Sequence, residues 1–165
     1  MSFEEADNGK ANQSNDKDNC AACVLAHELR LRGYDITALP YGGDKFASLS
    51  KDTKLIWMTK KEKEPSWSAN AGGTEKEIIS KIEKATKVIG SRYHLGWDIT
   101  EDYGHIITVV RTKERLIYYD PQRNEYCNLS DIIKEMQQDS KIQLLRVDNL
   151  LVRPKLLKSF TKEIS

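Results

Sequence analysis

A block of β-type sequence between residues 92 and 120 constrains the fold more than any other segment. It contains three short runs of aromatic and β-branched residues, at 92–98, 104–111 and 116–120, and such residues favour strands. Turn residues separate the runs, and the last two are joined by a short charged turn. We therefore expect an antiparallel sheet in the second half of the chain.

A helix that begins with a cysteine precedes this β-rich block. Apolar residues recur among strong helix formers at 21–32, and Gly33 follows as a stop signal. Cys20 therefore lies in the first turn of the helix. One such helix followed by an antiparallel sheet is the element order of an α+β domain, with the N-terminal helix packed on the sheet.

Weaker signals mark the other elements. Thr74 and Glu77 are spaced as a capping box, and Asn128 or Ser130 can cap a helix that follows. The remaining predicted elements are a helix beginning at Thr74, a helix at 129–137, strands at 34–39 and 141–147, and a stretch of ambiguous character at 44–73.

The composition of the two ends suggests one folded domain with short flanks. Residues 1–18 are polar and lack helical or strand periodicity, so we expect a flexible leader or a linker left from a longer polypeptide. We place the folded, site-bearing domain at 19–153, a length that suits a single hydrophobic core. Residues 154–165 are expected to be a C-terminal tail.

The overall charge argues against two classes of partner. The chain has 26 Lys and Arg residues against 25 Asp and Glu, so no global field draws it to nucleic acid or to an anionic membrane. Its longest apolar runs are far shorter than the roughly 20 residues that span a bilayer. Residues 1–19 contain no apolar stretch of the kind that a signal peptide requires. We expect neither a nucleic-acid nor a membrane partner.

Three cysteines, an odd number, do not form a disulfide framework. Cys20 and Cys23 could belong to a zinc site, but zinc would need two further Cys or His ligands at suitable spacing, and the three histidines show no paired ligand pattern. A redox dithiol should follow a hydrophobic strand, whereas a polar run precedes Cys20. We therefore expect no metal and no organic cofactor.

Cys20 is the better candidate for a nucleophile. Only the thiolate attacks a carbonyl carbon, and the free N–H groups and dipole of a helix N-terminus favour negative charge there. Those N–H groups can also stabilise the oxyanion of a tetrahedral intermediate. Cys23 lies one turn further into the helix before an apolar pair, so we expect it to be a buried, small apolar side chain.

A general base and its partner are expected on the two strands that follow. If the turn consists of residues 113–114, paired positions sum to 227, and Asp120 faces Ile107. His105 and Asp120 are then diagonal neighbours on one face, with backbones roughly 7–8 Å apart, which side chains can bridge. A one-residue slip would place them on opposite faces.

Each of these residues also has an ordinary structural interpretation. His105 could be a satisfied strand histidine, Asp120 an Asp-Pro turn acceptor, and Cys20 an inert thiol. Gly104 could admit a substrate backbone or simply mark a turn. The order of a cysteine helix, a histidine strand and an aspartate strand favours a thiol-dependent hydrolase over these separate interpretations.

Other polar and aromatic residues are further candidates for the site. Asn19 could donate a hydrogen bond to the oxyanion, but capping of the helix is favoured. Trp97 could form a wall of the substrate slot or belong to the core. His27 and His94 are expected to be structural, and Gln13 could act as an upstream oxyanion donor only if its segment were ordered.

Several short runs together resemble a known family. They are Asn19-Cys20-Ala21-Ala22-Cys23-Val24, residues 29–38, Gly104-His105-Ile106 and Tyr119-Asp120-Pro121-Gln122. Over about residues 19–132 the chain resembles the papain-fold toxin domains of bacterial polymorphic toxins, which are similar to effector enzymes that deamidate protein glutamines.

The resemblance implies a function and a setting. It implies a papain-like fold, a catalytic triad of Cys20, His105 and Asp120, and Gln122 near the site. The substrate would be a glutamine side chain of a target protein, and no cofactor would be needed. The domain would be delivered as part of a larger toxin, act in the cytoplasm of the target cell, and be a possible partner of an immunity protein.

Three alternatives remain open from the sequence. A papain-like cysteine peptidase would use the same triad with a different leaving group. A non-catalytic binding module would keep the fold without the chemistry. A nuclease toxin would use His105 with basic residues such as Arg111 and Arg115, and would survive thiol alkylation.

Overall fold

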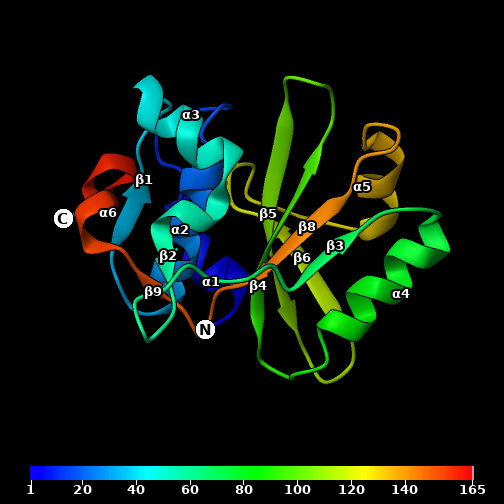
Figure 1. The fold of residues 1–165 in the computed structure, drawn as a ribbon. Helices are drawn as coiled ribbons and strands as arrows, with labels where there is room; N and C mark the ends of the chain where they lie inside the picture. The colour runs from blue at the N-terminus through cyan, green and yellow to red at the C-terminus, as the bar shows by residue number, and fades with distance from the viewer. Residues whose placement is uncertain (165) are drawn as a thin grey trace.

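The computed structural model describes residues 1–164 and has an α+β architecture, as the sequence predicts (Figure 1). A mixed half, built around a central helix, lies beside a six-stranded sheet. The helices are α1 (Phe3–Asp7), α2 (Cys20–Leu31), α3 (Gly43–Lys51), η1 (Thr53–Ile56), α4 (Glu75–Ala85), α5 (Leu129–Glu135) and α6 (Pro154–Phe160).

The six-stranded sheet has the order β3-β8-β4-β5-β6-β7, and every neighbouring pair is antiparallel. The three strands predicted at its centre are confirmed with the expected bounds. Its strands are β3 (Ala69–Ala71), β8 (Ile142–Arg146), β4 (Arg92–Asp98), β5 (Gly104–Arg111), β6 (Leu116–Asp120) and β7 (Glu125–Cys127).

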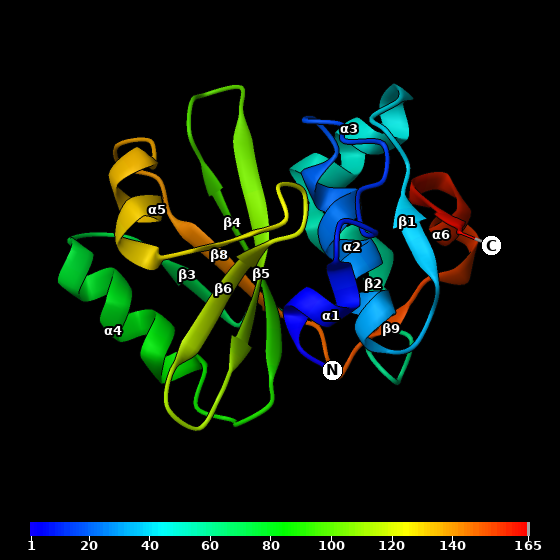
Figure 2. The ribbon, with the colours of Figure 1, turned by 180° about the vertical axis from the view of Figure 1, so that it is seen from behind.

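Two hydrophobic cores lie on opposite sides of this sheet. The first surrounds α2, whose residues from Ala21 to Leu29 are all buried, and it includes Ile106 of β5. The second contains Ile78 and Ile82 of α4 and Ile132 of α5, which cover the other face (Figure 2). The predicted cysteine-bearing helix is therefore confirmed, and it packs on the sheet.

Helix starts follow the predicted capping residues. The Thr74 side chain accepts a hydrogen bond from the Glu77 backbone N–H and begins α4. Of the two caps considered for α5, Asn128 is the one used, and its side chain accepts from the N–H of Asp131. Both helices are therefore short amphipathic elements with locally determined starts.

Residues 44–73, whose secondary structure the sequence does not predict, connect the two halves of the molecule. They form most of α3, then η1, the two-residue strand β2 (Trp57–Met58) and finally β3. Phe46 and Leu49 of α3 are buried in the core around α2. This segment places α3 beside the start of α2.

The C-terminal residues differ from the expected tail. Pro154 begins α6, whose Phe160 is buried. The strand β10 (Thr161–Glu163) then pairs antiparallel with β1 (Ile36–Ala38). A second small sheet pairs β2 with β9 (Leu151–Val152). Burial of Phe160 and the backbone pairing with β1 explain why this end is packed against the domain.

The N-terminal arm, residues 1–18, differs from the expected flexible leader. Ser2 and Glu5 form a capping box that starts α1. Phe3 is only 6% exposed, and its ring meets the rings of His27 and Tyr119. The arm therefore packs across α2 and β6, because its few apolar side chains are buried there.

This packing predicts a measurable contribution to stability. We expect Phe3→Ala to lower the free energy of unfolding by about 3 kcal/mol, the scale for deleting a buried aromatic ring. Tyr34→Ala is the matched control, because Tyr34 is 61% exposed and its loss should change stability by less than about 0.5 kcal/mol. Denaturant unfolding measures both, and equal values would contradict the packed arm.

Candidate functional site

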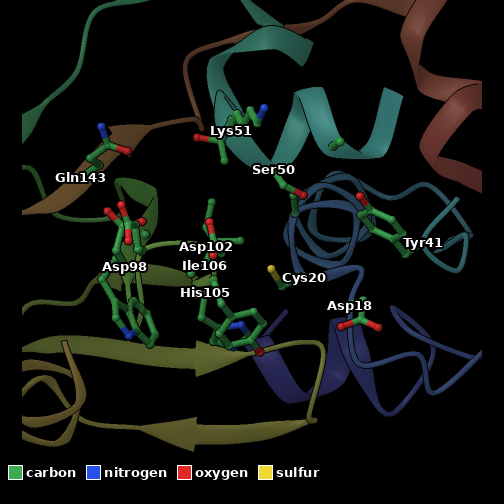
Figure 3. A pocket seen from close by; sticks show the side chains of 18 of the residues that line it. Asp18, Cys20, Tyr41, Ser50, Lys51, Asp98, Asp102, His105, Ile106 and Gln143 are labelled. Atoms are coloured by element: carbon green, nitrogen blue, oxygen red, sulfur yellow. The ribbon is translucent and has the colours of Figure 1, made fainter. Parts of the chain in front are cut away.

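The cleft between α2 and the sheet contains the candidate site. It has a volume of about 700 Å³. Its lining comes from the start of α2, from α3, from the loop between β4 and β5, and from β8 (Figure 3). Cys20 and His105 both line this cleft, although 85 residues separate them in the sequence.

Cys20 is the first residue of α2 and is partly exposed. The first intrahelical hydrogen bond runs from the Cys23 N–H to the carbonyl of Asn19. Within the described residues, no side chain caps α2. The first N–H groups of the helix therefore stay available beside the sulfur, as an oxyanion site requires.

Cys23 is fully buried, as expected of a small core side chain. Burial raises the pKa of its thiol well above the ordinary value, and the neighbouring charges of Cys20 and Asp120 raise it further. Its Sγ donates to Oδ1 of Asn19 at 3.3 Å. This thiol remains protonated at neutral pH, so it is unsuited to nucleophilic attack.

The predicted register of the hairpin is confirmed. Thr108 pairs with Tyr119 and Arg111 with Leu116, so paired positions sum to 227. One further step places Asp120 opposite Ile107. The His105 side chain then reaches Asp120, with Nε2 and Oδ2 2.6 Å apart.

The Asp120 carboxylate is buried and held on both oxygens. Oδ2 accepts from His105, while Oδ1 accepts from the backbone N–H groups of Gln122 at 3.0 Å and Arg123 at 3.3 Å. The Arg123 guanidinium lies 3.8 Å from Oδ2 but is half exposed. The turn that follows β6 therefore fixes the direction in which the carboxylate points.

The second ring nitrogen of His105 faces Cys20. Nδ1 is buried and makes no hydrogen bond of good geometry with any residue in 1–164. The Cys20 thiol is nevertheless close enough to interact with the ring. Such contacts are often loose without substrate. The imidazole is therefore hydrogen-bonded to the carboxylate and lies beside the sulfur.

The electrostatics favour a charged imidazole. Burial alone would lower the pKa of His105, but the hydrogen bond with Asp120, the adjacent Cys20 thiol and the negative charges of both groups raise it to about 9. At neutral pH the ring is then imidazolium, which is the form that can donate a proton to a leaving group.

Trp97 stands beside this pair. It is directly opposite His105 in the β4–β5 ladder, and the two rings meet edge to face at 5.4 Å. The indole Nε1 donates to Glu135 of α5 at 2.9 Å. Trp97 lines the cleft and also belongs to the core on the α4–α5 side, so both interpretations considered from the sequence apply.

Asn19 differs from both of its expected roles. Its side chain does not cap α2. Instead its Nδ2 donates to Asn12 Oδ1 and to the Leu39 carbonyl, and its Oδ1 accepts from Gln122 Nε2 at 3.4 Å. With both amide protons already donated, Asn19 has none left for an oxyanion. Gln122 is near the site, through this contact and its backbone bond to Asp120.

Gly104 is required for a reason other than substrate approach. A Cβ at this position would lie 2.7 Å from the carbonyl oxygen of Trp97. The missing side chain therefore lets β4 and β5 lie close together next to His105.

The other histidines are structural, as expected. His27 is buried, with Nδ1 near Thr108 Oγ1 and Nε2 near the Phe3 carbonyl. His94 is buried against the Trp57 ring, and burial lowers its pKa to about 4. Cys127 lies away from the cleft, and burial raises its pKa to about 12.

Two negative findings concern the same described residues. No group of three or more His, Cys, Asp and Glu side chains in 1–164 is arranged to hold a metal ion. Nor does any helix of this part of the chain combine the length and apolar content that a membrane span needs.

Sequence reasoning missed two groups at the site. Asn12 lies in the N-terminal arm and makes hydrogen bonds with both Asn19 and Gln122. The end of β4 and the loop that follows it contribute Asp98, Glu101 and Asp102 to the cleft wall. The Ser2-x-x-Glu5 capping box was a signal that the arm is ordered, whereas nothing in the sequence placed Asn12 itself.

The raised pKa of His105 can be measured directly. NMR titration of the ring should give a value near 9, and Asp120→Asn should lower it because the negative partner is lost. Because the pKa of His105 is higher in the folded than in the unfolded protein, the protonated ring stabilises the folded state. This contribution to the free energy of unfolding is complete below pH 6.5, the pKa of the unfolded state, and is lost as the pH rises through about 9. A value near 6.5 in both proteins would contradict the arrangement.

Comparison with known proteins supports the same interpretation. No curated protein matches the chain. The family model described as "Papain fold toxin 1, glutamine deamidase" matches residues 18–125. The matched segment contains Cys20, His105 and Asp120, and the fold has the nucleophile-bearing helix packed on an antiparallel sheet. Since the match covers well over half of the sequence, the chain belongs to the papain-fold toxin family of glutamine deamidases.

Proposed function

We propose that this domain is a thiol hydrolase that deamidates glutamine side chains of a target protein through Cys20, His105 and Asp120. One observation supports the proposal above all: in an open cleft, a single imidazole is hydrogen-bonded to a buried carboxylate and lies beside a cysteine at a helix N-terminus. The family description supports the choice of glutamine as the substrate.

The reaction begins with attack on the carboxamide. The Cys20 thiolate forms a C–S bond to the carbonyl carbon, and N–H groups at the start of α2 stabilise the oxyanion. As the intermediate collapses, the C–N bond breaks and the His105 imidazolium gives its proton to the nitrogen. Ammonia leaves, and a thioester remains.

Water completes the reaction. The neutral His105 ring takes a proton from water, which adds to the thioester carbon. The C–S bond then breaks, Cys20 leaves as thiolate, and glutamate is released. The balance is one glutamine and one water consumed for one glutamate and one ammonia formed, with no oxidant, metal or cofactor in any step.

Asp120 supports these steps without itself reacting. It accepts the Nε2–H bond, so it fixes the ring orientation and stabilises the imidazolium. The two backbone N–H groups of the following turn hold the carboxylate in place for this task. Nδ1 is thereby the nitrogen that exchanges protons with the sulfur and the leaving group.

The proposal includes a setting, for which the family description as a toxin is the support. A toxin domain of this kind would be delivered within a larger bacterial polypeptide and act in the cytoplasm of the target cell. A dedicated immunity protein that covers the cleft would protect the producing cell. Neither nucleic acid nor a membrane has a part in this proposal.

The decisive experiment is mass analysis of proteins incubated with the domain. Deamidation adds about one dalton to a glutamine-containing peptide, whereas proteolysis splits the chain. A blocked Gln-Gly peptide provides a defined probe, with ammonia release as the readout. New chain ends without the one-dalton change would favour a cysteine peptidase. Activity that persists after thiol alkylation would contradict the thiol mechanism.

The two neighbouring cysteines should respond differently to substitution. Cys20→Ala should reduce ammonia release to background, because the covalent bond cannot form. Cys23→Ala should keep the activity and cost about 1 kcal/mol of stability, the scale of one hydrogen bond. Full activity in Cys20→Ala together with loss in Cys23→Ala would reverse the assignment.

The triad members should also differ in importance. His105→Ala should be inactive, while Asp120→Ala and Asp120→Asn should be slow but measurable. The loss of rate in the two Asp120 variants should stay below the roughly 10⁴-fold seen in the serine triad, because a thiolate–imidazolium pair can form before substrate binds. The alkaline limb of the rate profile, near pH 9 in the unmodified protein, should move to lower pH. An unchanged rate and limb would remove Asp120 from the mechanism.

A further inference from the structure

We propose that Asn12, in the N-terminal arm, is a positioning residue that holds the start of α2 against the turn that orients Asp120. This inference rests on the proposed function, because it concerns how Cys20 is kept in line with His105. Asn12 is not itself in contact with the reacting groups that line the cleft.

The Asn12 side chain is buried, with only 4% of the residue exposed, and both ends of its amide are used. Nδ2 donates to the carbonyls of Asp16 at 3.0 Å and Gln122 at 3.1 Å. Oδ1 accepts from Asn19 Nδ2 at 3.0 Å and from the Ser14 hydroxyl at 3.1 Å. A buried amide with this many partners defines one geometry.

One of these partners leads to the nucleophile. Asn19 immediately precedes Cys20, and its other amide proton is donated to the Leu39 carbonyl at 2.9 Å. Its oxygen accepts from the Cys23 thiol, one turn into α2. The position at which α2 begins is therefore set by side-chain bonds that start at Asn12.

The other partner leads to the acid. The Gln122 carbonyl accepts from Asn12, while the Gln122 N–H donates to Asp120 Oδ1. The same residue is thus bonded to the arm on one side and to the catalytic carboxylate on the other. A single amide side chain connects the residue before Cys20 with the turn after Asp120.

Apolar packing does not duplicate this connection. At the start of α2 the apolar side chains are small: Ala11 of the arm and Ala21 and Ala22 of the helix are buried in the core around α2, and Cys20 packs against it. Such small side chains define a direction poorly, whereas the hydrogen bonds between the arm, the start of α2 and the turn after β6 are directional. Loss of the Asn12 bonds should therefore shift the catalytic groups without dissolving the core.

Asn12 lies outside the part of the chain that the family model matches. The family match begins at residue 18, so the arm lies before the matched segment. In this protein the arm packs on α2 and β6 and contributes a buried residue to the support of the site.

Asn12→Ala and Asn12→Ser test the proposal, with Ser as the smaller disturbance if Ala does not fold. A misplacement of about 1 Å can cost about 10²-fold in rate, so kcat for the blocked Gln-Gly peptide should fall about 10- to 100-fold, with KM within about twofold.

A second readout needs no substrate. The rate of Cys20 alkylation by iodoacetamide, followed by peptide mapping across pH, should fall about tenfold in both variants, on the scale of a small misplacement, and its pH dependence should shift. Because alkylation reports only the pairing of Cys20 with His105, it distinguishes failure of this inference from failure of the deamidase proposal.

Two controls separate positioning from general destabilisation. Gln13 is exposed and does not line the cleft, so the structure does not place it as an oxyanion donor, and Gln13→Ala should behave as the unmodified protein. Phe3→Leu weakens the packing of the same arm at its far end and should lower Tm without changing the alkylation profile. The inference is overturned if folded Asn12→Ala or Asn12→Ser keeps both readouts, or if Phe3→Leu alters the profile equally.

Discussion

The seating of α2 on the six-stranded sheet is the constraint on which the rest of the structure depends. A buried carboxylate fixes it: Glu28 accepts from Arg92 at the start of β4 and from Arg32 at the end of α2. Arg32 also donates to the carbonyls of Val147 and Leu150 and lies over the Trp57 ring. Removing both arginines would leave Glu28 as an uncompensated buried charge, at a cost of about 3–5 kcal/mol, so helix and sheet keep one relative orientation.

That orientation positions the residues of the proposed triad. With one end of α2 fixed by ion pairs, its other end places Cys20 over the beginning of β5, where His105 is bonded to Asp120 on the neighbouring strand. Each of the three proposed catalytic groups lies on a regular element and not on a free loop. The arm and the turn after β6 support the site from irregular backbone, and Asn12 joins those two to each other.

Much of this could be predicted from the sequence, because local rules decide it. Counting from the charged turn gave the pairing of β5 with β6, and hence the meeting of His105 and Asp120. The packing of the two ends could not be predicted, since α1 and β10 are stabilised by distant surfaces and not by their own periodicity. The prediction that the Asn19 side chain caps α2 was wrong for a similar reason. A capping rule is local, and hydrogen-bond partners from three separate segments outweighed it.

The close approach of β4 and β5 at Gly104 has a genetic consequence. A single methyl group there would meet the Trp97 carbonyl at 2.7 Å, and the simplest relief is a small separation of the strands beside His105. Trp97 and Ile106, which belong to the two cores, lie next to this point, so the strain would be shared between core packing and the position of His105. A change in a single codon would therefore act on the proposed base through a residue that has no side chain of its own.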